Sequence, residues 1–100
     1  MNVRGKAFVF GDRIDDIPVS ATKASTGHLL GGTGALEAIF TIMALQERVA
    51  PPTINITEQD PAVPFALSGA PVQLGSGQQL AISNSFGFGG HNAVAAFASV

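Results

Sequence analysis

The sequence of 100 residues predicts an α/β fold with one long helix and three short strands. The helix is predicted over residues 34–48, where apolar residues recur with the period of an α-helix. The strands are predicted at residues 17–21, 79–84 and 93–99, where short apolar runs lie near turn-forming residues. A chain of this length makes one small domain at most.

Two short features precede the first predicted strand. The apolar run of residues 7–10 fits a strand or a short helix, and its length does not decide between them. Residues 12–16 are polar and predict a turn. Pro18 lies within the predicted strand 17–21, which places that strand at the edge of a sheet, where a missing N–H does least harm.

The predicted helix is apolar nearly all round. One face carries Leu36, Ile39, Phe40, Met43 and Ala44, and the rest carries Ala35, Ala38, Ile42 and Leu45. Such a helix packs between layers, so we expect it to be buried. It ends before Pro51, and residues 51–79 are rich in loops. The run at residues 93–99 is also almost wholly apolar, as in a strand covered on both faces.

The composition predicts a surface that something else covers. Only 12% of the residues are charged and 46% are hydrophobic, whereas about 25% are charged in a typical protein. The net charge of −2 gives no basic surface for nucleic acid, and the absence of cysteine excludes disulfides and thiolate metal sites. No apolar run reaches the roughly 20 residues of a membrane span, and the N-terminus resembles neither a secretory signal nor a transit peptide.

The residues from Lys23 to Gly34 combine a cation, an imidazole and glycines directly before the helix. Glycines there either cradle an anion or let the helix approach a strand closely, and their spacing leaves both interpretations open. Glu37 lies on the apolar helix, where a carboxylate needs a partner. We therefore expect an ion pair between Lys23 and Glu37.

His28 follows Gly27, shortly before the N-terminus of the predicted helix. The helix dipole disfavours an imidazolium there, so we expect a neutral ring, in either a structural or a catalytic role. His91 by itself fits a loop residue. No cysteine or acidic residue accompanies the two histidines at the sequence spacing typical of a zinc site. We therefore expect neither a metal nor another cofactor.

A second glycine cluster, Gly87-Phe88-Gly89-Gly90, joins the last two predicted strands. Its glycines permit positive φ, so that exposed N–H groups can bind an oxyanion while Phe88 acts as a mobile apolar plug. The other interpretation is an ordinary tight β-turn with an aromatic anchor.

Four motifs in this order resemble the C-terminal part of the β-ketoacyl synthases that act on acyl carrier protein. These are the condensing enzymes of type II fatty acid synthesis, an acyltransferase family of lipid metabolism in the thiolase superfamily. The motifs are residues 19–32 (VSATKASTGHLLGG), Glu37-Ala38, residues 51–55 (PPTIN) and residues 84–90 (NSFGFGG).

The resemblance covers residues 8–100 and implies the last quarter of a longer enzyme. Residues 1–100 are then a fragment, a partial C-terminal domain of a thiolase-like fold with αβαβα layers. The family joins an acyl chain, held on a cysteine, to malonyl-carrier protein with loss of CO₂, and it uses one cysteine and two histidines. The implied partners are acyl carrier protein, with acyl and malonyl groups on phosphopantetheine, and a second copy in the full-length homodimer.

The resemblance also implies roles for individual residues. His28 is the second catalytic histidine, Lys23 supports the site with Glu37 as its partner, and Phe88 is the gating residue whose N–H contributes to an oxyanion hole. The glycines beside them are supporting residues: Gly27, Gly87, Gly89 and Gly90. Some family members hold a structural monovalent cation at the positions of Glu37, Ser83 and Asn84.

Two departures from the family pattern bear on activity. His91 follows the glycine cluster where the family usually has threonine, which can change gating or carrier-protein binding. The nucleophilic cysteine and the first histidine belong to family segments that precede this sequence, so we expect the chain alone to be inactive. The alternatives are a non-catalytic protein that binds an intact synthase or a carrier protein, and a stand-alone module that binds an anion or phosphopantetheine. The family works in bacterial cytoplasm, mitochondria and plastids, so the compartment stays open.

Overall fold

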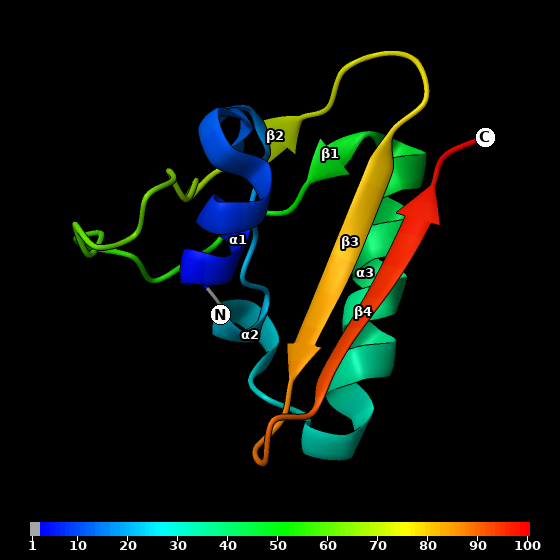
Figure 1. Ribbon diagram of the computed structural model, residues 1–100. Helices are drawn as coiled ribbons and strands as arrows, with labels where there is room; N and C mark the ends of the chain where they lie inside the picture. Colours follow the sequence, from blue (N-terminus) through cyan, green and yellow to red (C-terminus); the bar gives the residue numbers. More distant parts are fainter. Residues whose placement is uncertain (1–2) are drawn as a thin grey trace.

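The structure, a computed structural model, describes residues 3–100 and is a small mixed α/β arrangement of three α-helices and two antiparallel sheets (Figure 1). The helices are α1 (Val3–Phe10), α2 (Lys23–Thr26) and α3 (Thr33–Glu47), and 3₁₀ turns span Gly11–Asp16 and Leu30–Gly32. The strands are β1 (Val49–Ala50), β2 (Val72–Gln73), β3 (Leu80–Phe86) and β4 (Asn92–Ala98).

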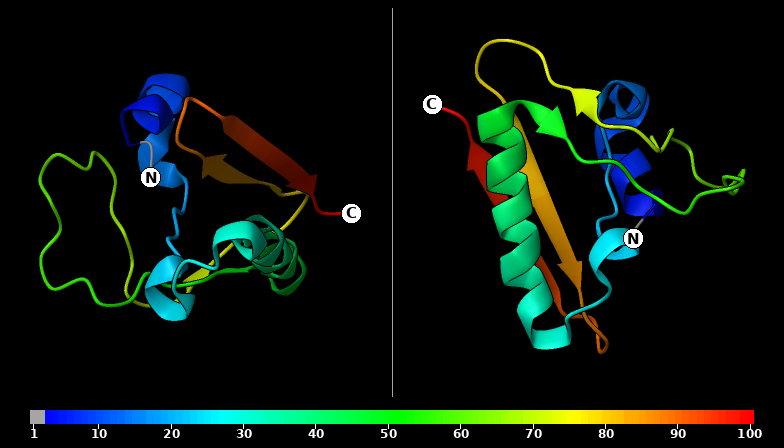
Figure 2. Two further views of the ribbon diagram at one scale, coloured as in Figure 1. Left: turned by 90° about the horizontal axis from the view of Figure 1, so that it is seen from below. Right: turned by 180° about the vertical axis from the view of Figure 1, so that it is seen from behind.

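The main layer is the β3–β4 hairpin with α3 packed on one face. The two strands pair in an unbroken antiparallel register from Leu80↔Ala98 to Phe86↔Asn92. Seen from below, α3 lies against one face of this hairpin, and no other described element lies over the opposite face (Figure 2). The predicted helix and the two predicted C-terminal strands are therefore present, each within a few residues of its expected bounds.

Arg48 ends α3 and turns the chain into β1. Its backbone adopts the left-handed conformation at φ 55°, and its N–H donates to the Ala44 carbonyl. The guanidinium Nη1 donates to the carbonyls of Gly75 and Gly77 at 2.9 and 2.7 Å. The helix thus ends before Pro51, as predicted, and Arg48 ties its end to the loop that leads into β3.

The core within the described residues is small. Four apolar side chains are buried, from four different parts of the chain: Ile14, Leu45, Ala50 and Phe65. The first short element is also settled, because residues 7–10 belong to α1 rather than to a strand. The polar turn predicted at residues 12–16 is part of the 3₁₀ turn Gly11–Asp16.

The strand predicted at residues 17–21 is wrong, since no strand of either sheet includes this segment. A strand requires a neighbour with which to exchange backbone hydrogen bonds. Here the segment is tied down through side chains instead. The Ser20 hydroxyl donates to the Pro51 carbonyl at 2.6 Å, and the Ala21 N–H donates to Thr53 Oγ1 at 3.0 Å.

The expected burial of the helix and of the last strand is not found within this chain. Large apolar side chains of α3 are exposed on the face away from the hairpin, namely Ile39, Ile42 and Met43. Val94 of β4 is also exposed. The apolar patterns are present, but among residues 3–100 only one side of the helix and one face of the hairpin are covered.

Candidate functional site

The predicted ion pair between Lys23 and Glu37 is present. Lys23 begins α2 and Glu37 lies in the second turn of α3, and Lys23 Nζ donates directly to Glu37 Oε1. The side chain of Glu37 is 14% exposed and that of Lys23 is 42% exposed. The pair therefore joins the two helices that flank His28, and the carboxylate is its more buried partner.

The ring of His28 is oriented by two groups from the following turn. Its Nδ1 accepts the N–H of Leu30 at 3.0 Å and lies 2.9 Å from Thr33 Oγ1. Because Nδ1 accepts a backbone N–H, it carries no proton, so the Thr33 hydroxyl donates to it as well. This arrangement holds a neutral ring with its proton on Nε2, the nitrogen for which the described residues supply no partner.

The backbone around His28 is folded tightly. Gly27 ends α2 with φ 75° and donates its N–H to the Lys23 carbonyl at 2.8 Å. Leu30 also has a positive φ, 52°, which is rare for a leucine. Strained backbone of this kind persists only where the surroundings enforce it and is common at functional sites.

The PPTIN motif holds the approach to this turn. Thr53 is buried and accepts the Ala21 N–H through its hydroxyl oxygen. Asn55 Nδ2 donates to the Ala24 carbonyl in α2 at 3.4 Å. The motif thus fixes the residues immediately before and within α2, which position Lys23.

The second glycine cluster closes the β3–β4 hairpin. The Gly87 N–H donates to the His91 carbonyl at 2.7 Å, and Gly89 and Gly90 have φ of 83° and 82°. Phe88 is fully exposed and its N–H has no partner among the described residues. The cluster is a turn, but its aromatic residue is not an anchor.

The glycine-cluster loop lies at the same end of the molecule as the start of α3 (Figures 1 and 2). Just inside this end, Gly34 of α3 faces Ser85 of β3, where a side chain on Gly34 would approach within 4.0 Å of Ser85 Oγ. Of the three glycines before and within the start of the helix, only Gly34 faces a strand closely. The structure therefore places His28 between the two helices that the Lys23–Glu37 pair joins. The glycine-cluster loop lies at the same end of the molecule, and the described residues show no hydrogen bond between this loop and the turn of His28.

The remaining candidate positions are Ser83 and Asn84, near which the resemblance implies a monovalent cation. Ser83 and Asn84 are consecutive residues of β3, so their side chains point to opposite faces of the hairpin. Only Ser83 shares the face of Ser85, toward α3, while Glu37 is paired with Lys23. Among residues 3–100 no group of three or more His, Cys, Asp or Glu side chains is arranged to hold a metal ion, and no helix has the length and apolarity needed to cross a bilayer.

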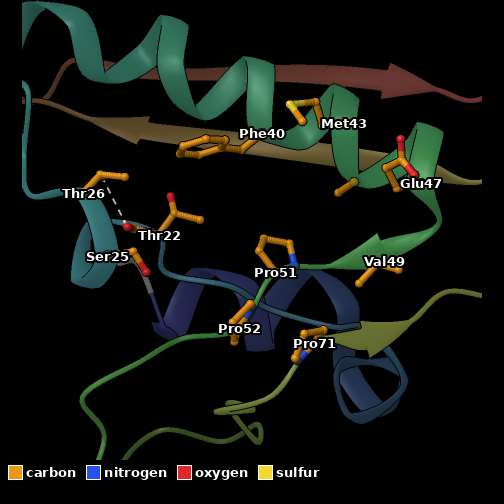
Figure 3. Close-up of a pocket in the computed structure, with 11 residues that line it drawn as sticks. Thr22, Ser25, Thr26, Phe40, Met43, Glu47, Val49, Pro51, Pro52 and Pro71 are labelled. Atoms are coloured by element: carbon orange, nitrogen blue, oxygen red, sulfur yellow. Dashed lines mark hydrogen bonds between the residues drawn. The ribbon is translucent and has the colours of Figure 1, made fainter.

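A separate apolar pocket of about 330 Å³ lies between α2, α3 and the segment around β1 (Figure 3). Phe40 and Met43 of α3 reach toward Pro51 and Pro52 across it. Neither His28 nor Phe88 lines this pocket, so it is separate from these two candidate site residues.

Sequence reasoning missed Thr33 and Thr53, the two buried threonines that hold the site. The only signal for Thr33 was its place between the glycines at the start of a helix, where a hydroxyl is free to bond neighbouring groups. Nothing in the sequence around Thr53 indicated that its partner lies at Ala21.

Residues 3–57 match the family described as the β-ketoacyl synthase C-terminal domain. The 3-oxoacyl-[acyl-carrier-protein] synthase 2 of Synechocystis sp. is 49% identical over 92 residues, which cover 87% of this chain and 21% of that protein. The mitochondrial 3-oxoacyl-[acyl-carrier-protein] synthase of Arabidopsis thaliana is 47% identical over 81 residues, 81% of this chain and 18% of that protein. The synthase 2 of Mycobacterium tuberculosis is 43% identical over 79 residues, 79% and 19% of the two chains.

The chain thus spans about a fifth of the length of these curated relatives. The family match includes the whole turn from Lys23 to Glu37, and the longer matches extend over most of the chain. On this evidence the chain belongs to the β-ketoacyl synthase family and corresponds to its C-terminal part.

Proposed function

We propose that this chain supplies the decarboxylation and gating residues of a 3-oxoacyl-acyl-carrier-protein synthase. The whole enzyme would condense an acyl thioester with malonyl-carrier protein in fatty acid synthesis. The nucleophilic cysteine comes from another segment, since this chain contains none, so the chain alone has no condensing activity.

The orientation of His28 carries the proposal. With Nδ1 occupied by Leu30 and Thr33, the ring presents Nε2–H as a fixed, neutral hydrogen-bond donor. A donor of this kind is what an enolate oxygen requires, because it stabilises negative charge as the charge develops.

The reaction divides into steps in which His28 has one task. The bond between the malonyl carboxylate and its α-carbon breaks, CO₂ leaves, and the electron pair remains as a thioester enolate. Nε2–H of His28 donates to the enolate oxygen. The enolate carbon then attacks the carbonyl of the acyl thioester, and the cysteine leaves as a thiolate.

The other site residues act around this step. The Lys23–Glu37 pair joins α2 to α3 and so fixes the turn that carries His28. The N–H of Phe88, which has no partner among the described residues, is available to an oxyanion. Gly89 and Gly90 have no Cβ, so the backbone beside the exposed ring can change conformation and the ring can change its position. The partner in this proposal is acyl carrier protein, which delivers the malonyl group on phosphopantetheine.

A hybrid synthase tests the proposal. In it, this chain replaces the matching C-terminal segment of the Synechocystis synthase, which supplies the remaining sequence. We expect the hybrid to condense acyl- and malonyl-carrier protein. His28→Ala should lower malonyl decarboxylation by about 10²- to 10⁴-fold, while acyl transfer to the cysteine continues.

The second histidine provides a matched control. His91→Thr introduces the residue usual in the family, and we expect this variant to keep decarboxylation activity. Near-normal condensation by the His28→Ala hybrid would refute the role of His28.

The second candidate function is a non-catalytic subunit that binds a synthase or a carrier protein. The exposed apolar faces of α3 and of the hairpin favour it, because they require a cover. A hybrid that folds and binds carrier protein, but does not decarboxylate malonyl groups even with His28 intact, would support this alternative.

A further inference from the structure

The two lysines of the chain, Lys6 in α1 and Lys23 in α2, lie in different environments. Lys23 is exposed and donates to Glu37, whereas Lys6 is half-buried and forms no ion pair with a described residue. An ammonium in an ion pair has no free lone pair, but an unpaired and partly desolvated amine gives up its proton more readily. The two side chains therefore differ in their capacity to act as nucleophiles.

Lys6 is unpaired even though acidic residues lie close to it in the sequence. Among the described elements, α1 packs only on the 3₁₀ turn that follows it. This turn carries three carboxylates, those of Asp12, Asp15 and Asp16, and none of them forms an ion pair with Lys6. Burial lowers the pKa of the Lys6 ammonium, because the charged form loses solvation and gains no counter-ion in exchange.

Helix α1 also presents apolar side chains to solvent beside this amine. Phe8 is 90% exposed and Val9 is 72% exposed. Residues three positions apart are neighbours on a helix surface, so Val9 lies on the same side of α1 as Lys6. Covering an exposed valine with a hydrocarbon chain is favourable. An aliphatic acyl group can therefore rest on Val9 while its carbonyl carbon meets the amine.

We propose that Lys6 is an acylation site, whose amine accepts an aliphatic acyl group from a thioester. The unprotonated Nζ attacks the thioester carbonyl carbon, so that a C–N bond forms and the C–S bond breaks. The sulfur leaves as a thiolate, and the nitrogen releases one proton to water. The product is a neutral amide, which removes one of the few positive charges of the chain.

The choice of a thioester as the acyl donor rests on the proposed function, because a 3-oxoacyl synthase works with acyl thioesters. The difference between the two lysines does not rest on it. That difference follows from the half-buried, unpaired state of Lys6 and from the pairing of Lys23 with Glu37.

The test incubates the full chain, in dilute solution at neutral pH, with the octanoyl thioester of N-acetylcysteamine. Mass spectrometry of peptides measures the rate of acylation at each lysine. We expect Lys6 to react about tenfold faster than Lys23, since desolvation activates a lysine and an ion pair protects one. The same chain in urea gives the baseline, because both amines are then solvated and unpaired and should react at similar rates.

Substitutions separate the amine from its apolar neighbour. Lys6→Arg keeps the positive charge but removes the nucleophile, and should lose most of the acyl incorporation. At Lys6 we expect octanoyl transfer to exceed acetyl transfer by about fourfold, the effect of about one methylene group removed from water. Val9→Ser should remove this preference. Val94→Ser makes the same change at an exposed valine of β4, which α1 does not contact, and should retain it.

Equal rates at Lys6 and Lys23 in the folded chain would overturn the proposal, as would a ratio that urea does not change. Both measurements use the unmodified chain, so they do not depend on whether a variant folds. Because no condensation is measured, acylation of Lys6 can be found even if the hybrid synthase fails to decarboxylate malonyl groups, and the two proposals fail separately.

Discussion

His28 has its ring held from one side only, by hydrogen bonds at Nδ1. Thr33→Val removes the hydroxyl that donates to this nitrogen while keeping the size and branching of the side chain. Loss of one such bond is worth about 1 kcal/mol, so we expect about fivefold slower malonyl decarboxylation by the hybrid synthase. The KM for malonyl-carrier protein should change little, because Thr33 acts through His28.

Thr41 provides the matched control for this prediction. It lies on the same helix, and its hydroxyl donates to the Glu37 carbonyl rather than to His28. Thr41→Val should leave the decarboxylation rate near that of the parent hybrid. Equal losses in the two variants would mean that the helix, and not the ring of His28, responds to the substitution.

The Lys23–Glu37 pair is asymmetric, because its carboxylate is the less exposed partner. Lys23→Met leaves that carboxylate without its cation, and we expect a loss of about 2 kcal/mol in unfolding free energy, discounted for partial exposure. Glu37→Gln leaves a half-exposed ammonium and should lose about 1 kcal/mol. Urea unfolding of the two hybrid variants gives the comparison. A Glu37→Gln hybrid as stable as its parent would show that the pair contributes nothing.

At the scale of elements, the glycine-cluster loop depends on backbone conformations that other residues seldom adopt. An alanine at Gly89 would find space, since its Cβ would lie 3.7 Å from the His91 ring, but it would retain φ near 83°. We expect Gly89→Ala to reduce stability by about 1–2 kcal/mol and to slow condensation by the hybrid. Urea unfolding and steady-state kinetics measure the two effects.

Gly69→Ala is the corresponding control. Gly69 lies in open space and its φ is outside the left-handed range. This substitution should be neutral or slightly stabilising, because it restricts the unfolded chain. If both alanines had the same effect, the conformation of the glycine cluster would not be the cause.

The elements differ in how far local sequence determines them. The helix could be predicted because its apolar period and the prolines after it are local signals, and the β3–β4 hairpin because two apolar runs flank a glycine cluster. The strand predicted at residues 17–21 is wrong, because apolar composition does not show that Ser20 and Ala21 bond to Pro51 and Thr53 instead of to a neighbouring strand. Apolar composition indicates that a segment can be covered, but it does not say which chain covers it.

The candidate site also contains some features that the sequence predicts and others that it does not. Desolvation of a carboxylate on an apolar helix predicted the Lys23–Glu37 pair without any knowledge of the fold. The contacts of Thr33 and Thr53 could not be predicted, because hydroxyl groups bond to whatever the folded backbone brings near them. The roles of His28 and Phe88 remain predictions until the hybrid synthase is assayed.

At the scale of the whole molecule, the low content of charged residues and the exposed apolar faces together favour self-association. The hairpin exposes Leu80 and Val94 on a mostly apolar face, and α3 exposes a second apolar surface. With 12% charged residues there is little electrostatic repulsion between copies. We expect the isolated chain to self-associate at micromolar concentration, measured by sedimentation velocity, and to bind a dye that reports exposed apolar surface.

Paired substitutions of opposite charge test where this association occurs. Leu80→Lys combined with Val94→Glu leaves the net charge unchanged while making the hairpin face polar, so the chain should shift toward monomer. Gln46→Lys combined with Ser76→Glu adds the same charges at exposed polar positions and should not change the distribution of species. We expect the preceding part of the Synechocystis synthase to suppress association of the unmodified chain by covering the hairpin face. Continued association in that complex would place the self-contact on α3 rather than on the hairpin.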